Sequence, residues 1–483
     1  MQFLPADMNI IMPEIIMALI AIIILLADLV IKRKKSLAFL GVIGAGVVAY
    51  TIMMDSPGAA FSGMFISDGY SKFFKLIFLV NVILVTMISV KYIIIEKINL
   101  GEYYSLMLFS TLGMMVMASA GDLITLYVGL ELMALSTYVL TGFIRHNTKS
   151  NEAAIKYFLL GAFSSAFLLY GISMIYGLTG TLELKDIADY INKNGLENNK
   201  VLMLSMILFV VGFGFKIAAA PFHMWAPDAY EGAPTSITAF MSVGTKAAGF
   251  AAIGRVFMIA LPAIKLEWST ILIPLAILSI AVGNIAAIAQ TNIKRMLAYS
   301  AIAHAGYALL GVIAADNEGI VSMMSYLMIY TFMNIGAFAV IIMLRGEGAK
   351  GEDINDYEGL AKKHPVLAAF MLIFMFSLTG IPPTAGFIGK FYVFMSAINA
   401  GYVWPVVVAV IFSAISAYFY LRIVMYMYMK EPINNVGVQN FEPLLSTSPA
   451  IGIVLIVAAA ALLGIGIFPS FLLELARAAI SGF

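Results

Sequence analysis

Residues 212–250 read GFGFKIAAAPFHMWAPDAYEGAPTSITAFMSVGTKAAGF, and they begin and end inside segments apolar enough to lie in a bilayer. The stretch nevertheless contains Lys216 and Lys246 and is interrupted by prolines. A lysine at the centre of a membrane helix costs roughly 2.5–3.5 kcal/mol on insertion scales, so two of them are hard to explain by packing. The stretch therefore predicts a membrane protein that handles protons or cations through buried ionisable side chains.

The composition of the whole chain agrees with this prediction. Of the 483 residues, 62% are hydrophobic and 11% are charged, whereas about 25% of an ordinary globular protein is charged. Apolar runs of the length that a membrane helix needs recur from end to end, and the short alternating segments of a membrane β-barrel are absent. The predicted fold class is an all-α polytopic membrane protein, with a single integral membrane domain over residues 1–483.

Several kinds of chemistry are excluded from this chain. It has no cysteine, which removes disulfides, thiolate zinc sites and cysteine-ligated iron–sulfur clusters. No glycine-rich nucleotide motif follows a strand-like run, and the histidines show no metal-ligand spacing. We therefore expect redox or nucleotide chemistry on partner chains. The N-terminus lacks a basic leader and a cleavage site, so we expect the first helix to be retained.

The apolar runs predict about 14 membrane spans joined by short loops. The two longest connections, residues 180–200 and 346–364, are polar and are expected to lie against the membrane surface. The predicted spans are 10–31, 37–54, 72–94, 103–119, 122–143, 153–178, 201–227, 234–261, 270–290, 296–314, 319–345, 365–398, 402–428 and 449–473.

Lysines and arginines are concentrated in the loops after odd-numbered spans, which include Lys149, Lys294 and Arg295. The loops and ends on the other side contain few, among them Lys75. Positive charge marks the cytoplasmic side of a membrane protein. Both termini are therefore predicted to face the outside, which is the periplasm for a bacterial inner membrane.

Charges within the predicted spans are mostly positive. Glu131 is the one carboxylate well inside a span, whereas Glu14 lies near a helix end and is expected to reach water. Intramembrane ionisable residues are functional by default. The basic residues within spans are Lys156, Lys216, Lys246, Arg255, Lys390 and Arg422.

Two predicted spans are broken by proline beside a lysine. The seventh is interrupted at Pro221, near Lys216, and the twelfth at residues 381–383, before Lys390. In transporters, paired interruptions at matching positions of two repeats mark the ion path. The positions predict repeats of spans 4–8 and 9–13, over residues 103–261 and 270–428.

Lys216 and Lys390 are the strongest candidates for proton transfer. A helix break frees backbone carbonyls, which are satisfied by water or polar groups. Partial desolvation also weakens a lysine's hold on its proton, so a lysine there can take up and release one. The alternative is a structural lysine that only satisfies the freed carbonyls.

Glu131, within GLELMALSTYVL, is the expected partner of Lys216. An opposite charge a few ångströms away keeps both groups ionised, and separating the pair favours release of the lysine's proton. The pair would then act as a switch. The alternative is a static ion pair that fixes helix packing.

Lys246 lies mid-span among small residues, and it could relay charge from Lys216 toward the second half of the chain. Lys156 lies early in its span, so the alternative to a role in proton transfer is that it snorkels to the interface. Arg255 and Arg422 stay charged under any condition and are expected to be electrostatic anchors or to snorkel at helix ends, rather than to carry protons.

His304 lies mid-span near Tyr299, Ser300 and Tyr307 and suits proton relay near neutral pH. The competing interpretation is a neutral histidine bonded to a hydroxyl. His223 follows the break in the seventh span and is a secondary candidate, for proton uptake.

Four stretches together resemble a known family. They are PFHMWAPDAYEGAPTSITAFMSVGTKAAGF, GLELMALSTYVL, NEAAIKYFLLGAFSSAFLLYGISMIYGLTG and NIKRMLAYSAIAHAGY. They are similar to the N subunit (subunit 2) of proton-pumping NADH:quinone oxidoreductase, respiratory complex I. The resemblance runs from about the fourth to the thirteenth span. The form YEGAPT followed by SVGTK is more similar to this subunit than to its antiporter-like paralogues.

The resemblance implies 14 helices, two inverted five-helix repeats and a buried relay. It implies that Glu131 and Lys216 form the family's glutamate–lysine pair, and that His304 is its bridging histidine. Lys156, Lys246 and Lys390 match its span-6, connecting and terminal lysines. It also implies packing against the antiporter-like and other membrane subunits of the complex, and no cofactor on this chain. NADH, FMN, iron–sulfur clusters and quinone are expected on partner subunits.

The sequence therefore predicts a proton-translocating subunit of an NADH:quinone oxidoreductase, coupled to electron transfer in its partners. One rival is a subunit of a multisubunit sodium/proton antiporter or of a membrane-bound hydrogenase-type complex. A sodium site would need several carboxylates, and one mid-membrane glutamate provides poorly for it. The other rival is a structural subunit that does not pump.

Overall fold

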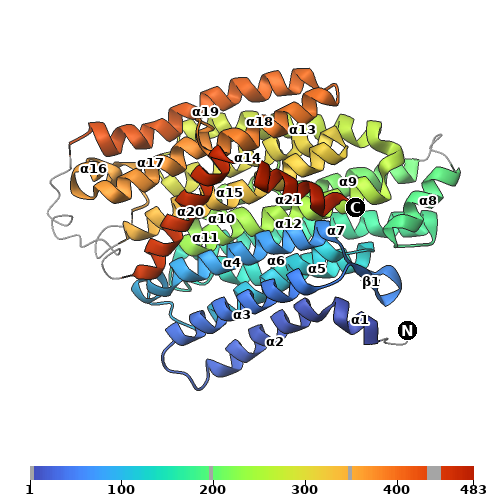
Figure 1. Ribbon diagram of the computed structural model, residues 1–483, viewed down its shortest axis with the longest axis horizontal. Helices are drawn as coiled ribbons and strands as arrows, with labels where there is room; N and C mark the ends of the chain where they lie inside the picture. Colours follow the sequence, from blue (N-terminus) through green and yellow to red (C-terminus); the bar gives the residue numbers. More distant parts are fainter. Residues whose placement is uncertain (1–4, 195–199, 346–350, 432–447, 483) are drawn as a thin grey trace.

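The computed structural model describes residues 5–194, 200–345, 351–431 and 448–482. Most of the long helices run roughly side by side along one direction (Figure 1). The first half contains α1 (Pro5–Ile10), α2 (Met12–Ala27), α3 (Lys35–Met54), β1 (Gly58–Ala60), η1 (Phe61–Gly63), β2 (Phe65–Ser67), α4 (Gly69–Ile95), α5 (Glu102–Ser119), α6 (Leu123–Thr141), α7 (Thr148–Thr179), α8 (Leu184–Asn194), α9 (Lys200–Lys216), α10 (Trp225–Gly232), α11 (Thr235–Phe240), η2 (Met241–Thr245), α12 (Lys246–Gly254), η3 (Arg255–Ala260) and η4 (Pro262–Ile264).

The remaining elements are all helices. They are α13 (Lys265–Ile288), α14 (Ile293–Ala314), α15 (Asn317–Met343), η5 (Ile354–Tyr357), α16 (Leu360–Lys363), α17 (Pro365–Thr379), α18 (Ala385–Asn399), α19 (Val403–Met429), α20 (Pro449–Ile467) and α21 (Ser470–Ile480).

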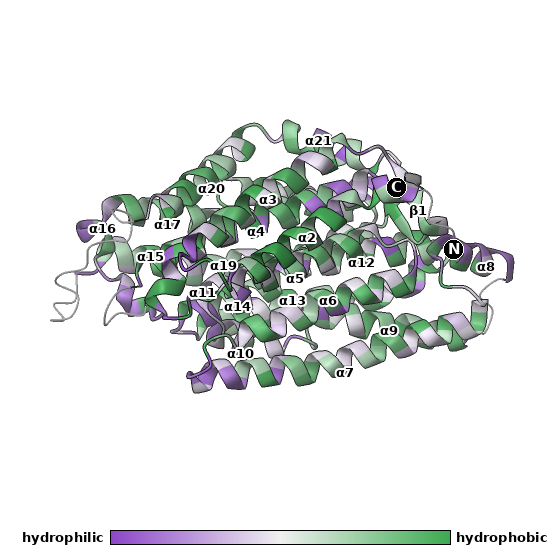
Figure 2. Ribbon diagram, turned by 90° about the horizontal axis from the view of Figure 1, so that it is seen from below, coloured by the Kyte–Doolittle hydropathy of each residue, from purple (hydrophilic) through white to green (hydrophobic). Residues whose placement is uncertain are grey.

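Hydropathy follows the helix axes. Hydrophobic residues cover the length of the helices, and hydrophilic residues gather mainly at the two ends of the bundle (Figure 2). Within the described residues, 10 helical segments are long and apolar enough to cross a membrane. Three segments, Met12–Ala27, Pro365–Thr379 and the α9–α10 pair, match predicted spans but are short or broken. The prediction of an all-α polytopic membrane protein is confirmed.

The two predicted helix breaks are present. Helix α9 ends at Lys216, and α10 begins at Trp225. Helix α17 ends at Thr379, and α18 begins at Ala385. Proline lacks the N–H that a helix needs and clashes with the preceding turn. The prolines that interrupt the apolar pattern therefore interrupt the helices as well.

Matching backbone bridges lie at opposite ends of the bundle. Asp122, which caps α6, pairs with Glu183 just before α8. Asn292, which caps α14, pairs with Asp353, shortly before α16. Helices α8 and α16 lie at the right and left ends of Figure 1, respectively. Two like arrangements that point in opposite directions are what an inverted repeat requires.

Glycine brings together the first two helices of each predicted repeat. A Cβ on Gly113 of α5 would lie 2.5 Å from the backbone nitrogen of Met133 in α6. A Cβ on Gly283 of α13 would lie 2.6 Å from the backbone nitrogen of Ala303 in α14. No side chain fits in either place, so these helix pairs pack through glycine, as small residues allow in membranes.

Two buried ion pairs attach α4 to its neighbours. Lys75 lies 2.7 Å from Glu14 of α2, and both side chains are almost fully buried. Arg255 makes two 2.7 Å hydrogen bonds to Asp68, the residue that caps α4. The expectation that Glu14 reaches water is therefore wrong, and Lys75, counted with the loops and ends on the outer side, is buried. Both residues lie within two turns of a helix end, and their side chains turn inward.

Candidate functional site

Lys246 lies in the middle of the bundle, 2% exposed, at the start of α12. Its ammonium donates a 2.6 Å hydrogen bond to the carbonyl oxygen of Ala301 in α14. The π-helical segment η2 immediately precedes it, and such segments often occur at functional sites. Lys246 therefore connects α12, in the first predicted repeat, with α14, in the second.

His304 lies one turn beyond Ala301 and is 3% exposed. Its Nδ1 lies 2.5 Å from the hydroxyl of Tyr326, and its Nε2 lies 3.1 Å from the hydroxyl of Tyr420. The Tyr420 hydroxyl also bonds Ser300. Because both ring nitrogens have a hydroxyl partner, the imidazole can accept a proton on one side and donate one on the other.

Lys390, in α18, lies at the second helix break and is 5% exposed. Its ammonium donates to the carbonyls of Leu378 and Thr379 at 3.1 and 2.8 Å, and to the Ser413 hydroxyl at 2.9 Å. It also lies 5.0 Å from the ring centre of Tyr307. The ring of Tyr307 is 5.8 Å from that of His304, so Lys390 and His304 contact the same aromatic side chain.

A cavity of about 350 Å³ reaches the Lys390 ammonium. Its polar lining comes from Thr379, Lys390 and Ser413, and the rest is apolar. A cavity of this volume has room for water, and its polar groups can hydrogen-bond to it. Water there could exchange protons with Lys390.

Lys216, the last residue of α9, is 3% exposed. Its Nζ has no hydrogen-bond partner among the described residues and lies 5.7 Å from the ring centre of Tyr138. A Cβ on Gly249 would lie 3.6 Å from a side-chain carbon of Lys216. Gly249 follows Lys246 by three residues, so α12 brings both lysines into one region.

Glu131 does not form the expected direct ion pair. It is half-buried on α6 and accepts a hydrogen bond from Ser165 of α7. In the described part of the chain, no ion pair joins it to Lys216. Tyr138, two turns further along α6, has its ring centre 5.7 Å from the ammonium. The carboxylate and the ammonium are thus on neighbouring helices but apart.

Lys156 belongs to a different place. It is 44% exposed, and it pairs with Glu152 at 2.7 Å and with Asp228 at 2.8 Å. Arg295 binds the same Asp228 at 2.8 Å. These groups line a pocket of about 190 Å³ at the end of α10. Lys156 is thus exposed and ion-paired at a helix end, apart from the buried lysines.

The carboxyls of this ionic pocket are held ionised. Burial acts to raise the pKa of Asp228, but hydrogen bonds from Lys156 and Arg295 outweigh it, so the pKa is lowered. Burial likewise acts to raise the pKa of Glu231, and hydrogen bonds from Lys149 and Arg295 lower it. The pocket therefore stays charged at neutral pH.

His223 lies in the break between α9 and α10 and is partly exposed. Its Nδ1 has no partner among the described residues. The two arginines act as anchors: Arg255 holds Asp68, and Arg422 donates to the carbonyls of Ile288 and Gln290 at the end of α13. A cation there stabilises the carboxyl end of a helix.

Some polar residues of this region were not predicted. Tyr326 and Tyr420 bind both nitrogens of His304, but a tyrosine within an apolar run gives no signal of where its hydroxyl points. Lys294 was placed in a solvated loop, yet it is 2% exposed. Among the described residues, no group of three histidine or carboxylate side chains could hold a metal ion.

The fold and this set of residues match one class of membrane protein. The family described as NADH:quinone oxidoreductase/Mrp antiporter, TM, matches residues 120–416. This range includes both helix breaks, and Lys246 and His304 between them. A chain of the Mrp complex from Dietzia sp. DQ12-45-1b has the same fold, with a TM-score of 0.82 at 20% identity, covering 99% of this chain and 97% of that one.

The similarity to one branch of this class is much closer. NADH-quinone oxidoreductase subunit N from Trichlorobacter lovleyi is 48% identical over 99% of this chain and 98% of its own. A chain of respiratory complex I from Thermus thermophilus with bound aureothin is 33% identical, with a TM-score of 0.81 over 96% of this chain and 99% of that one. This chain belongs to the NADH-quinone oxidoreductase subunit N family, as its sequence motifs predicted.

Proposed function

We propose that this chain moves protons across the membrane through a relay formed by Glu131, Lys216, Lys246, His304 and Lys390. As an antiporter-like membrane subunit of an NADH-quinone oxidoreductase, it would convert electron transfer in partner subunits into proton movement. Redox chemistry is absent from the proposed role. NADH, FMN, iron–sulfur clusters and quinone would be bound by the partners.

One observation supports the relay most strongly. Lys246 bonds the carbonyl of Ala301, one turn before His304 in α14, and His304 and Lys390 both contact Tyr307. All of these groups are buried, where an uncompensated charge is costly. A proton that arrives at one of them therefore changes the free energy of protonating its neighbour, because charges interact strongly at low dielectric.

In the proposed sequence, His304 is the bridge. A proton delivered through the Tyr326 or Tyr420 hydroxyl to one ring nitrogen allows the other nitrogen to release one. A positive His304 and a positive Lys390 repel each other, which favours release from Lys390 toward its cavity. The hydrogen bonds to Leu378, Thr379 and Ser413 hold the ammonium beside that cavity.

Glu131 and Lys216 would set the charge at the other end. Their separation corresponds to the open form of the predicted switch, in which the lysine releases its proton most easily. Movement of α6 against α9 would close the pair and load Lys216. His223, in the break, would take up protons, and Lys156 would stay paired with Asp228 at the ionic pocket.

The proposed placement follows the charges of the loops. The chain would lie in the bacterial inner membrane with both termini on the periplasmic side, and its repeats would cover residues 103–261 and 270–428. It would pack against the antiporter-like and other membrane subunits of the complex. The opposite ends of α8 and α16 in Figure 1 support the inverted arrangement.

The experiment is a measurement of proton movement in vesicles that contain the assembled complex. Lys216→Met and Lys390→Met should each abolish proton translocation coupled to quinone reduction, because methionine keeps the length of the side chain and removes the ammonium. Lys362→Met removes an exposed lysine and should change nothing. Intact translocation in both buried-lysine variants would mean that the chain is a structural subunit.

The rival function is sodium/proton antiport of the Mrp type, or a role in a hydrogenase-type membrane complex. The shared fold with the Dietzia chain favours neither function by itself. Sodium-dependent proton movement without quinone reduction would favour the antiporter. Isolation together with flavin and iron–sulfur subunits would favour the oxidoreductase.

A further inference from the structure

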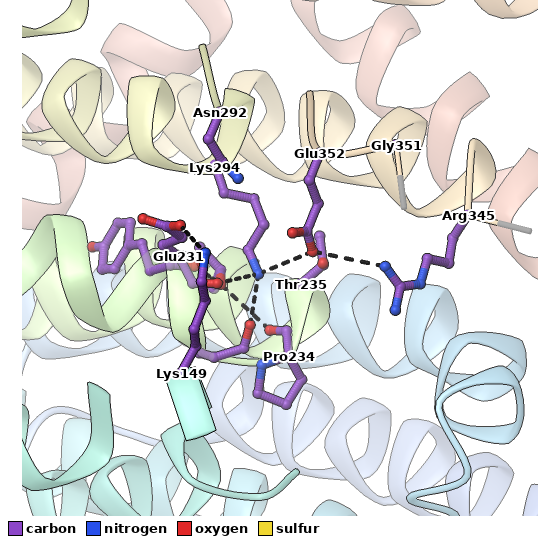
Figure 3. Close-up of polar contacts among 12 residues, drawn as sticks. Lys149, Glu231, Pro234, Thr235, Asn292, Lys294, Arg345, Gly351 and Glu352 are labelled. Carbon is purple, nitrogen blue, oxygen red and sulfur yellow. Dashed lines mark hydrogen bonds and ion pairs between the residues drawn. The ribbon is translucent and has the colours of Figure 1, made fainter. Parts of the chain in front are cut away.

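Lys294 has contacts that the proposed relay does not use. It lies in the first turn of α14 and is 2% exposed. Its ammonium donates hydrogen bonds to the carbonyl oxygens of Glu231 and Ala233, at 2.9 and 2.7 Å. Figure 3 shows the side chain extending from α14 across to the segment that ends at Pro234.

These carbonyls belong to the end of the broken helix. Helix α10 ends at Gly232, and the last carbonyls of a helix have no N–H partner within it. Pro234 follows and has no N–H to offer. A buried cation at this position supplies the missing donors and interacts favourably with the helix dipole. Lys294 therefore closes the carboxyl end of α10.

A carboxylate holds the ammonium from the other side. Glu352 lies 3.5 Å from Lys294 and 3.9 Å from Arg345, whose Nε lies 2.5 Å from Glu96 at the end of α4. The carbonyl oxygen of Glu352 accepts the N–H of Ile293 at 2.8 Å. Lys294 is thus fixed by the loop before η5 as well as by α10 (Figure 3).

The neighbouring Arg295 has a different role. It binds the side-chain carboxylates of Asp228 and Glu231 and is 30% exposed. Lys294 instead binds main-chain oxygens in the interior. Of these two consecutive basic residues, Arg295 makes the solvated ionic contact and Lys294 makes the buried contact to the backbone.

The buried contact recurs deeper in the same pair of segments. From Pro234 the chain continues into α11, η2 and α12 without a break, and it carries Lys246 to the Ala301 carbonyl of α14. Lys294 and Lys246 therefore both connect α14 to the segment that runs from the end of α10 into α12, one at each end of that segment. Loss of the first contact would leave α14 free to shift against α12, and His304 lies one turn beyond Ala301.

We propose that Lys294 is a positioning residue for proton transfer between Lys246 and His304. It acts by fixing α14 against the end of α10, and it neither receives nor donates the transferred proton. This inference rests on the proposed function, because it concerns the geometry of that relay.

The test uses the assembled complex in membrane vesicles, with quinone reduction and proton translocation measured together. Lys294→Met should lower the rate of proton translocation by about twofold to thirtyfold, the range for residues that modulate coupling without touching the ligand. Quinone reduction by an uncoupled complex and the amount of assembled complex should stay unchanged. Lys294→Arg, which keeps the charge and donors, should retain most translocation. Lys362→Met serves as the exposed-lysine control.

The outcomes separate this inference from the proposed function. If Lys294→Met translocates normally while Lys246→Met does not, the positioning role is wrong and the relay stands. If neither variant changes translocation, the relay itself is wrong. Should Lys294→Met fail to assemble, Glu352→Gln decides: it leaves the carbonyl contacts and is expected to lower translocation by a smaller factor. Normal translocation in Glu352→Gln would then overturn the positioning role.

Discussion

Lys390 and Lys216 each lie beside a break in a helix, but only Lys390 donates hydrogen bonds to the carbonyls that its break leaves free. The Lys390 ammonium donates to Leu378 and Thr379, the last carbonyls of α17. In the first break, the Phe215 carbonyl instead accepts the indole N–H of Trp225 at 3.0 Å. Lys216 is left without a hydrogen-bond partner among the described residues. One lysine is held in place by the backbone, and the other is free to respond to charge.

Whether a helix break fixes its lysine depends on which donor satisfies the freed carbonyls. A break that satisfies its carbonyls with a neutral donor spares the ammonium. That lysine then depends on nearby charge, here Glu131 on the adjacent helix, as an opposite charge favours its protonated form. The first break is therefore suited to switching and the second to holding a proton beside a cavity.

The largest expected effect is a difference between two lysine variants. Lys390→Met should lower the free energy of unfolding by about 1–3 kcal/mol, because buried acceptors lose their donor. Lys216→Met should leave stability unchanged or raise it, because it removes a buried charge that has no hydrogen bond. The thermal unfolding midpoint of the purified complex measures both. Equal losses in the two variants would contradict the conclusion that the backbone holds Lys390 but not Lys216.

Trp225→Phe should be the next largest effect. It removes one of two donors to the Phe215 carbonyl while keeping a ring to stack on Tyr157, whose centre is now 4.3 Å away. The carbonyl keeps the 3.0 Å hydrogen bond from the Ala218 N–H. The loss should therefore be the net value of one hydrogen bond, about 0.5–1.5 kcal/mol, plus the packing lost with the smaller ring. Trp404→Phe changes a tryptophan that is 59% exposed and should leave the midpoint of thermal unfolding unchanged. An unchanged midpoint in Trp225→Phe would mean that the Ala218 N–H alone is enough for this carbonyl.

Ser413→Ala tests the second break more finely. The variant takes one of three acceptors from Lys390, so the stability loss should be about 0.5–1.5 kcal/mol, the net value of one hydrogen bond. Ser416, one turn further along α19, donates only within its own helix, to Ser413. Ser416→Ala should therefore change stability less, as thermal unfolding of both variants would reveal. The reverse order would contradict the role given to Ser413.

The smallest effect is expected for Lys156→Met. Its ion pairs are exposed, and such pairs contribute little and are screened by salt. The midpoint of thermal unfolding should stay within experimental error of the unchanged protein at physiological salt. A clear loss of stability would show that a partner subunit buries this ionic pocket.

Much of the fold could be predicted from the sequence because it depends on one-dimensional signals. Apolar run length located the spans, and the prolines near Lys216 and Lys390 located both breaks. Lys75 and Lys294 could not be predicted, because each lies within two turns of a helix end. Hydropathy assigns such positions to water whichever way the side chain turns.

The candidate site likewise contains residues that the sequence identifies and residues that it does not. A charge within an apolar run identifies Lys246 and His304 as unusual, and the structure brings both together. The hydroxyls of Tyr326 and Tyr420 depend on the relative rotation of α14, α15 and α19, which no local pattern records. The direct Glu131–Lys216 pair was expected from complementary charge alone, and the hydrogen bond from Ser165 holds the carboxylate elsewhere.

The buried ion pairs of α4 have a consequence for biosynthesis. In both pairs the acid precedes the base along the chain: Glu14 comes before Lys75, and Asp68 precedes Arg255 by 187 residues. A polypeptide emerges from the ribosome N-terminus first. Each cation therefore reaches the membrane after its counter-charge is already there. Exchanging Asp68 and Arg255 would preserve the folded contact. The arginine would then insert into the membrane before the aspartate that neutralises it had been made.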